Sequence, residues 1–165
     1  MADLVEIARK YVGQTEVPGP GFNAWIRDTW LSLPGGSWFW DTYGKDDSKL
    51  PWCGAFVARC CKEAGLTLPK AYSSALSWAT WGEDAGCPLH GAVAVLKRDG
   101  GGHVAIVTGV SEDGKMVRLL GGNQNDSVND AWFLASRVTA WRKPAGSILP
   151  HAKVATIGDL SKSEA

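Results

Sequence analysis

Residues 51–65 read PWCGAFVARCCKEAG. The apolar residues after Trp52 recur at helical spacing and Gly65 is a suitable stop, so this stretch predicts a helix over 53–64. Cys53 therefore stands at the start of a helix, where unpaired N–H groups and a partial positive charge favour a thiolate over a thiol. A buried structural cysteine is the alternative, but we predict that Cys53 is a nucleophile and that its own backbone N–H helps to hold an oxyanion.

Downstream of this helix the pattern changes to the two-residue period of strands. Four strands are predicted, with sequences GAVAVL at 91–96, HVAIVT at 103–108, MVRLL at 116–120 and RVTAWR at 137–142. A hairpin turn is predicted at 112–115, between the second and third of them. Antiparallel pairing of consecutive strands is therefore expected.

Upstream, the periodicity predicts a helix over 2–12 and a second helix through Leu33 that Asn23 caps. Residues 34–50 are expected to form a long polar and aromatic loop, and 74–81 a short helix. Helices thus come first and strands second. This order predicts an α+β fold, with the N-terminal helices packed on one side of a central antiparallel sheet.

His103 opens the second predicted strand, directly after the glycines at 100–102. These glycines let the backbone bend, so we expect His103 at a sheet edge facing a cleft. A helix start packed against a strand start would bring His103 within hydrogen-bond reach of Cys53, as a general base requires. The other two histidines, His90 before a strand and His151 near the C-terminus, are more typical of solvated positions.

Asn123 follows the third predicted strand, in the sequence VRLLGGNQND. If that strand pairs antiparallel with the strand of His103, its end lies beside the start of the other. An amide oxygen there would accept a hydrogen bond from the imidazole and fix its tautomer. Gln124 is a rival by adjacency, and a run of Asn and Gly is also typical of a simple turn.

Tryptophan is abundant, with 9 among 165 residues. Most of these rings are expected to pack in the core. Trp52 is the strongest candidate for a wall of the substrate site, because it adjoins the nucleophile and an indole offers a flat face to sugars or peptide backbones. Gln124 is a second candidate for contact with substrate.

The bulk composition excludes several classes. Lys and Arg total 17, as do Asp and Glu, so the formal net charge is zero, which argues against a nucleic-acid-binding protein. The four cysteines are expected to be reduced. A zinc site built from Cys60, Cys61, Cys87 and His90 is the competing interpretation, but no C-x-x-C or H-E-x-x-H occurs, so we expect no metal.

The length of 165 residues favours one domain, which we place at 1–147, followed by a polar C-terminal tail at 148–165. No window of 18 residues is apolar enough for a membrane-spanning helix. Asp3 and Glu6 stand where a signal peptide would need a basic start and an apolar run. We therefore expect a monomer made in the cytoplasm without a signal peptide.

Three motifs in this order carry a family resemblance: PWCGAFV at 51–57, GGHVAIV at 101–107 and GGNQ at 121–124. Together the three motifs resemble the papain-like cysteine hydrolases of the CHAP and NlpC type, and within them a phage-associated, endolysin-like subfamily. The resemblance is strongest over 51–125. Relatives usually have Gly-Asp where this chain has Gly91-Ala92.

The resemblance implies a papain-like fold and a triad of Cys53, His103 and Asn123, although relatives vary in the third residue. It implies hydrolysis of an amide bond in bacterial peptidoglycan, by an endopeptidase or an N-acetylmuramoyl-L-alanine amidase, without a cofactor. It also implies action on the wall after release of the protein, through lysis, a phage particle or dedicated secretion. The alternatives are a non-catalytic wall-binding or virion module, and an acyltransferase with the same triad.

Overall fold

The computed structural model describes residues 3–18, 21–43 and 45–155. The α-helices are α1 (Leu4–Arg9), α2 (Ala24–Leu31), α3 (Gly36–Thr42) and α4 (Cys53–Glu63). The 3₁₀ helices are η1 (Asp47–Lys49), η2 (Ala75–Thr80) and η3 (Ala135–Arg137). The strands are β1 (Glu83–Asp84), β2 (Val93–Arg98), β3 (Gly101–Val110), β4 (Met116–Gln124), β5 (Ser127–Leu134) and β6 (Val138–Lys143).

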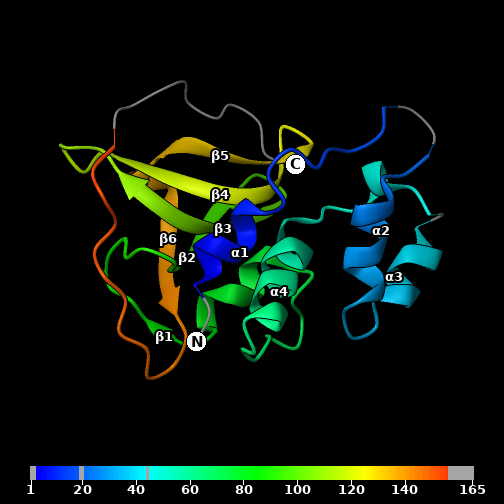
Figure 1. Ribbon diagram of the computed structural model, residues 1–165, viewed down its shortest axis with the longest axis horizontal. Coiled ribbons are helices and arrows are strands. Elements are labelled where there is room, and N and C mark those ends of the chain that lie inside the picture. The colour runs from blue at the N-terminus through cyan, green and yellow to red at the C-terminus, as the bar shows by residue number, and fades with distance from the viewer. Residues whose placement is uncertain (1–2, 19–20, 44, 156–165) are drawn as a thin grey trace.

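The six strands form one sheet in the order β1-β6-β2-β3-β4-β5, and the neighbouring strands pair antiparallel. Helices α1 and α4 lie against this sheet, and α2 and α3 lie side by side beyond α4 (Figure 1). The predicted α+β class and the antiparallel pairing of β3 with β4 are confirmed.

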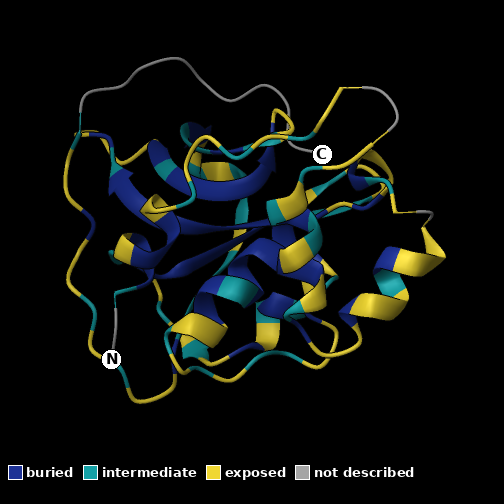
Figure 2. Cartoon of the chain, turned by 45° about the vertical axis from the view of Figure 1, so that its right-hand side comes forward, coloured by how far each residue is buried: buried dark blue, intermediate teal, exposed yellow. Residues whose placement is uncertain are grey.

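Each face of the sheet has its own apolar cluster. The helices pack on one face, where Val104 and Ile106 of β3 join the core with Phe56 of α4. On the other face, Ala105 and Val107 pack with Phe133 of β5 and with Ala152. Alternate residues of β3 therefore point to opposite sides, and the strands are largely buried (Figure 2).

The predicted loop at 34–50 contains helix α3 and the short helix η1. Gly35 caps α3 with a φ of 68°, a conformation that favours glycine. A Cβ on Gly36 would overlap the carbonyl oxygen of Trp30 and lie 2.5 Å from its carbonyl carbon, so only glycine lets α3 approach α2 this closely. Phe39 then packs on Trp30, with ring centroids 5.2 Å apart. Tertiary packing of aromatic side chains explains a helix that local sequence did not predict.

The sequence analysis missed strand β5, because polar residues interrupt its alternation. Asp130 in the middle of β5 accepts a hydrogen bond from Thr108 at 2.7 Å and forms ion pairs with Arg9 and Arg118, each at 3.2 Å. These partners satisfy the carboxylate within the sheet. The predicted strand at 137–142 corresponds to β6, shifted by one residue.

The segment after β6 was predicted to begin a polar tail at residue 148. In the structure its backbone pairs with the loop before β2 and with the end of β3: the N–H of Ala152 donates to Pro88 O at 3.1 Å, and the N–H of Val110 donates to Lys153 O at 2.9 Å. Ala152 is buried. Residues 156–165, the remainder of the predicted tail, lie outside the described residues.

Candidate active site

Cys53 is the first residue of α4, as predicted, and only 2% of its surface is exposed. The preceding residue, Trp52, is the N-cap, and its side chain makes no hydrogen bond to the backbone of the helix. A Cβ on Gly54 would lie 3.2 Å from the carbonyl oxygen of Ser73, so the glycine lets the 72–73 loop pass against the start of the helix. The sequence PWCG thus builds a tightly enclosed helix start.

The start of α4 is inserted where β3 and β4 separate. The register of these strands runs from Ile106 opposite Leu120 to Val110 opposite Val117, and stops short of the start of β3. The backbone N–H of Val104 is one of the donors that stabilise the sulfur of Cys53. The nucleophile candidate therefore contacts the residue that follows His103 in the chain.

On β4, Gly122 makes this insertion possible. A Cβ at this position would lie 2.7 Å from the Cβ of Phe56 and 2.8 Å from the ring of Trp52. Contacts this short do not occur between real side chains, so any larger residue would push α4 away from the sheet. Gly122 of the GGNQ motif therefore lets the helix that carries Cys53 approach the strands.

His103 lies near the start of β3 and is fully buried. Its Nε2 lies 3.0 Å from Oε1 of Gln124, and its ring stacks on Phe133 with centroids 5.8 Å apart and planes inclined by 23°. The imidazole is thus fixed in position and in the plane of its ring. We predicted such an orienting hydrogen bond, but from a different residue.

The amide group of Gln124 determines the tautomer of His103. Nε2 of Gln124 donates to Oδ1 of Asn129 at 2.8 Å, to O of Asn129 at 2.9 Å and to O of Leu119 at 3.3 Å. Because these partners are all acceptors, the NH2 group must face them and the Oε1 atom must face His103. Nε2 of the imidazole therefore donates the hydrogen bond, and Nδ1 is the basic nitrogen.

The predicted orienting residue, Asn123, does not make this hydrogen bond. Asn123 has a φ of 59°, and its Oδ1 atom is buried without a hydrogen-bond partner. The register with β5 shifts between Gly121 and Gln124, so the strict alternation of side chains is lost here. Gln124 consequently turns back over Gly121, onto the face of the sheet that holds Ala105.

Gln124 and Trp52, the two residues predicted to contact substrate, both make buried contacts within the protein, and their contact with substrate stays a prediction. Both residues are fully buried. The polar atoms of the Gln124 side chain are engaged within the protein, and the Trp52 ring packs edge-on against Trp25 with centroids 6.2 Å apart. Gln124 therefore orients His103, and Trp52 anchors the start of α4 in the core.

Residues 45–123 match the CHAP domain. The match spans slightly less than half of the 165 residues. It includes Cys53 and His103 and ends at Asn123, one residue before the partner of the imidazole. CHAP domains are typically hydrolases that act on peptidoglycan, so the match indicates this general activity. No curated protein and no solved structure gives a significant match.

In the CHAP segment, the pKa of the Cys53 thiol is raised above its ordinary value, chiefly because the group is buried. The N–H groups of Val104 and Gly54 and the charge of Arg98 oppose this shift without reversing it. The helix start alone had led us to expect the opposite direction. Burial of the sulfur within the protein outweighs the N–H groups that favour the thiolate, and so favours the neutral thiol.

We therefore expect iodoacetamide to label Cys53 slowly at neutral pH, and the rate to keep rising as the pH increases through 9, the ordinary value for the thiol. The thiolate is the reactive form, and a raised pKa moves its appearance to higher pH. Mass spectrometry of the peptide that carries Cys53 measures the rate, with an unstructured cysteine peptide as reference. A labelling rate that is already at its plateau below pH 7 would contradict this prediction and indicate a preformed thiolate–imidazolium pair.

A carboxylate supports the helix start from outside the CHAP segment. Oε1 of Glu16 accepts a hydrogen bond from the indole N–H of Trp52 at 2.9 Å. Burial raises the pKa of Glu16; the hydrogen bond from Trp52 opposes this shift, and the nearby Asp126, Asp47 and Asp46 add to it. The ionised Glu16 is therefore less favourable in the folded protein than in the unfolded chain.

A raised pKa in the folded state contributes stability that is present below the unfolded pKa of Glu, about 4.3, and is lost as the pH rises through the folded value. Glu16→Gln keeps the acceptor and removes the charge. We expect the free energy of unfolding of this variant, relative to wild type, to be higher at pH 7 than at pH 4. Denaturant titrations at both pH values measure it, with the exposed Glu6→Gln as control. A difference that does not change with pH would contradict the prediction.

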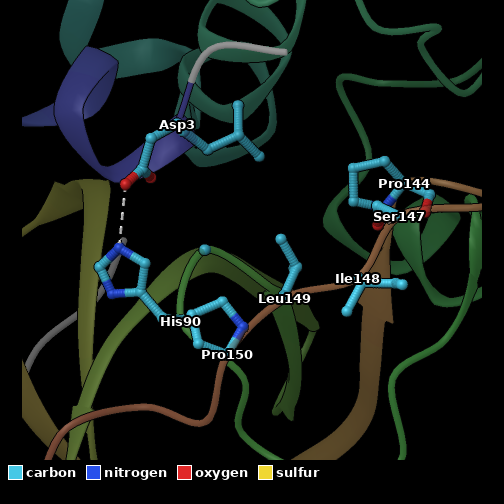
Figure 3. A pocket seen from close by; sticks show the side chains of 9 residues that line it. Asp3, His90, Pro144, Ser147, Ile148, Leu149 and Pro150 are labelled. Atoms are coloured by element: carbon cyan, nitrogen blue, oxygen red, sulfur yellow. Dashed lines mark hydrogen bonds and ion pairs between the residues drawn. The ribbon is translucent and has the colours of Figure 1, made fainter.

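One cavity adjoins the start of β2, away from the candidate residues, and a smaller one lies close to Cys53 in the chain. A cavity of about 330 Å³ is lined by Asp3, His90 and the 144–150 segment, with Asp3 Oδ2 and His90 Nε2 3.1 Å apart (Figure 3). This cavity adjoins Gly91, before the start of β2, whereas His103 pairs with Leu96 toward the end of that strand. A smaller cavity, of about 160 Å³, adjoins Pro51, two residues before the nucleophile candidate.

Metal binding gains no support from the cysteines and histidines considered above. Cys60 and Cys61 are buried in the apolar core on α4, and His90 faces Asp3. Within the described residues, His, Cys, Asp and Glu side chains do not gather in threes that could bind a metal ion. In the same part of the chain, none of the helices has the length and apolar composition needed to cross a bilayer.

Proposed function

We propose that this protein is a papain-like cysteine hydrolase that cleaves an amide bond in peptidoglycan, with Cys53 as nucleophile, His103 as general base and Gln124 as the residue that orients His103. One observation carries the proposal: the sulfur at the start of α4 contacts the N–H of Val104, beside a histidine whose Nε2 is held by Gln124 at 3.0 Å. The CHAP match supports the substrate class.

In the proposed reaction, Nδ1 of His103 removes the proton from Cys53 as the sulfur attacks the amide carbonyl. The N–H of Cys53 stabilises the negative charge on the carbonyl oxygen. His103 then gives the proton to the leaving amine, and the C–N bond breaks. Water, deprotonated by His103, attacks the thioester, which releases the carboxylic acid and restores the thiol. Protons balance in the acylation step and in the deacylation step, and no cofactor takes part.

Transfer of the proton during attack suits a resting thiol. Since burial raises the pKa of Cys53, a preformed ion pair is not required, and the imidazole acts when substrate arrives. Gln124 supports this role because its hydrogen bond to Nε2 keeps Nδ1 as the basic nitrogen. The same hydrogen bond stabilises the imidazolium that forms when Nδ1 is protonated.

We also propose where the protein is made and how it reaches its substrate. The protein is made in the cytoplasm as a monomer and reaches the wall after release by lysis, on a phage particle or by dedicated secretion. The three sequence motifs support a phage-associated, endolysin-like relationship. A non-catalytic wall-binding module and an acyltransferase remain the competing functions, and both can be tested directly.

Digestion of defined muropeptides tests the proposal. Mass spectrometry of the products should show the gain of one water and a new pair of amino and carboxyl termini. A new amino group on L-alanine with intact sugar would identify the amidase, and cleavage within the stem peptide the endopeptidase. Wall binding without new termini would support the non-catalytic module, and incorporation of an added amine in place of water would support the acyltransferase.

A further inference from the structure

A small aromatic pocket lies at the junction of α3 with the loop before the nucleophile. Its volume is about 160 Å³. Two flanking loops contribute Leu50, Pro51 and Ser73. Three aromatic residues complete the lining: the fully buried Trp30 of α2, Phe39 of α3, and the exposed Tyr43, which is the C-cap of α3. None of these lining residues is charged. The volume is below the range of about 300–1,000 Å³ that encloses a whole drug-sized ligand, so it suits one ring of a larger polymer.

Two of the lining residues connect the pocket directly to Cys53. Pro51 precedes it by two residues. The carbonyl oxygen of Ser73 would lie 3.2 Å from a Cβ on Gly54, so Ser73 lies against the start of α4. A ligand in the pocket therefore lies against both segments that enclose the start of α4. Its position is next to the proposed reaction centre rather than at a remote surface.

Tyr72 does not line the pocket but packs against two residues that do, Trp30 and Phe39. The hydroxyl of Tyr72 donates to Pro34 O at 2.6 Å, and the indole N–H of Trp78 donates to Tyr72 O at 3.0 Å. The ring of Tyr72 also packs against Trp30 and Phe39, with centroids 6.5 Å away in each case. This bracing fixes the pocket before a ligand binds, which lowers the entropic cost of binding.

We propose that this aromatic pocket is a glycan subsite, which takes the uncharged face of an N-acetylated sugar ring. This inference rests on the proposed function. Peptidoglycan offers two kinds of group: neutral N-acetyl sugars, and stem peptides that carry free carboxylates and amines. An uncharged aromatic lining matches the sugars, because flat rings bury the apolar face of a pyranose while Tyr43 and Ser73 offer hydroxyl groups to its edge. A charged peptide group would lose its hydration there without gaining an ion pair.

The position of the pocket also selects the bond. In muramic acid the lactyl carbonyl is attached close to the sugar ring, and the pocket proposed for that ring is lined by Pro51, two residues before Cys53. Bonds farther along the stem peptide would leave the sugar too distant to fill the pocket. A glycan subsite at this position therefore favours N-acetylmuramoyl-L-alanine amidase activity over endopeptidase activity. Helix α3, which supplies Phe39, precedes the segment that matches the CHAP domain, so the subsite is an addition outside that match.

Binding of a neutral β-1,4-linked N-acetylglucosamine tetramer to the full chain tests the subsite without requiring catalysis. The titration uses Cys53→Ala protein and monitors binding by calorimetry or NMR shifts. Adding Tyr43→Ala should weaken binding about 5- to 10-fold, the usual effect of losing one aromatic contact. Trp38→Ala is the matched control, because Trp38 is also an aromatic residue of α3, is 62% exposed and does not line the pocket. It should change binding less than about 2-fold.

A second measurement compares the wild-type enzyme on a disaccharide–peptide and on the same peptide without sugar. Only the first should be cleaved, and Tyr43→Ala should raise its KM. Absence of tetramer binding at millimolar concentration, or equal weakening by Trp38→Ala, would overturn the subsite. Hydrolysis of sugar-free peptide together with such a result leaves the proposed function intact and removes only the glycan inference. Tetramer binding that depends on Tyr43, with no hydrolysis of any muropeptide, would preserve the subsite and remove the enzyme.

Discussion

Cys53→Ala should abolish the release of new amino groups from purified peptidoglycan, with a loss of at least about 10⁴-fold in rate. The acyl-enzyme route needs a sulfur at the start of α4, and alanine offers no atom that can attack the carbonyl. The substitution removes one buried atom from a position whose backbone is helical. The expected change in stability is about 1 kcal/mol, so the fold should survive.

Two controls make this result specific to Cys53. Cys87→Ala removes a half-buried free thiol outside the enclosed helix start and should leave the rate within about 2-fold of wild type. Cys53→Ser keeps a nucleophilic atom, but its hydroxyl is a far weaker nucleophile, so the rate should still fall by orders of magnitude. Circular dichroism and a denaturant titration establish that each variant is folded. Undiminished wall lysis by a folded Cys53→Ala protein would remove the proposed mechanism.

The sequence predicted the helix of Cys53 and the strand of His103 well, because both depend on regular spacing of apolar residues. α4 spans Cys53–Glu63 against an expected 53–64, and β3 contains the whole of the expected strand at 103–108. Apolar periodicity reports which face of an element is buried, and burial decides these two elements. The sulfur of Cys53 contacts the backbone of Val104, the residue that follows His103, whereas contact between the side chains of Cys53 and His103 stays a prediction.

Elements that depend on distant partners were not predictable in this way. Helix α3 forms because Gly36 lets Trp30 approach and Phe39 pack on it, and neither contact is encoded in local spacing. Strand β5 includes Asp130, whose charge is satisfied by Arg9 and Arg118 from other parts of the chain. The pKa of Cys53 was predicted in the wrong direction for the same reason: the helix start is local, but the enclosure that raises it is tertiary.

The same distinction explains why the partner of His103 was misassigned. In a regular strand, Asn123 would share a face with Gly121, and Gln124 would point the other way. The φ of 59° at Asn123 and the register shift beside it reverse this order. Gly121 then leaves room for the Gln124 side chain to lie across the strand. The GGNQ motif therefore specifies a bulge, and the bulge determines which amide reaches the imidazole.

Gln124→Leu should lower the rate of hydrolysis by about 10²-fold, at the lower end of the usual contribution of a general base. The imidazole loses the acceptor that holds Nε2 at 3.0 Å, so neither its tautomer nor its orientation remains fixed. Asn123→Gly is the matched control. Glycine suits the φ of 59° at that position and removes the neighbouring amide, so the rate should stay within about 3-fold of wild type.

A structural role for Gln124 alone would also lower the rate, because leucine removes the hydrogen bonds that the Gln124 side chain donates to O and Oδ1 of Asn129, at a cost of about 1–3 kcal/mol. Gln124→Glu separates the two effects. It keeps an oxygen toward Nε2, and its negative charge favours the protonated imidazole and so raises the pKa of His103. Since the base must be neutral to act, the acid limb of the profile of kcat/KM against pH should move to higher pH. An unchanged profile in Gln124→Glu, or a loss in Asn123→Gly as large as in Gln124→Leu, would show that Gln124 does not orient the base.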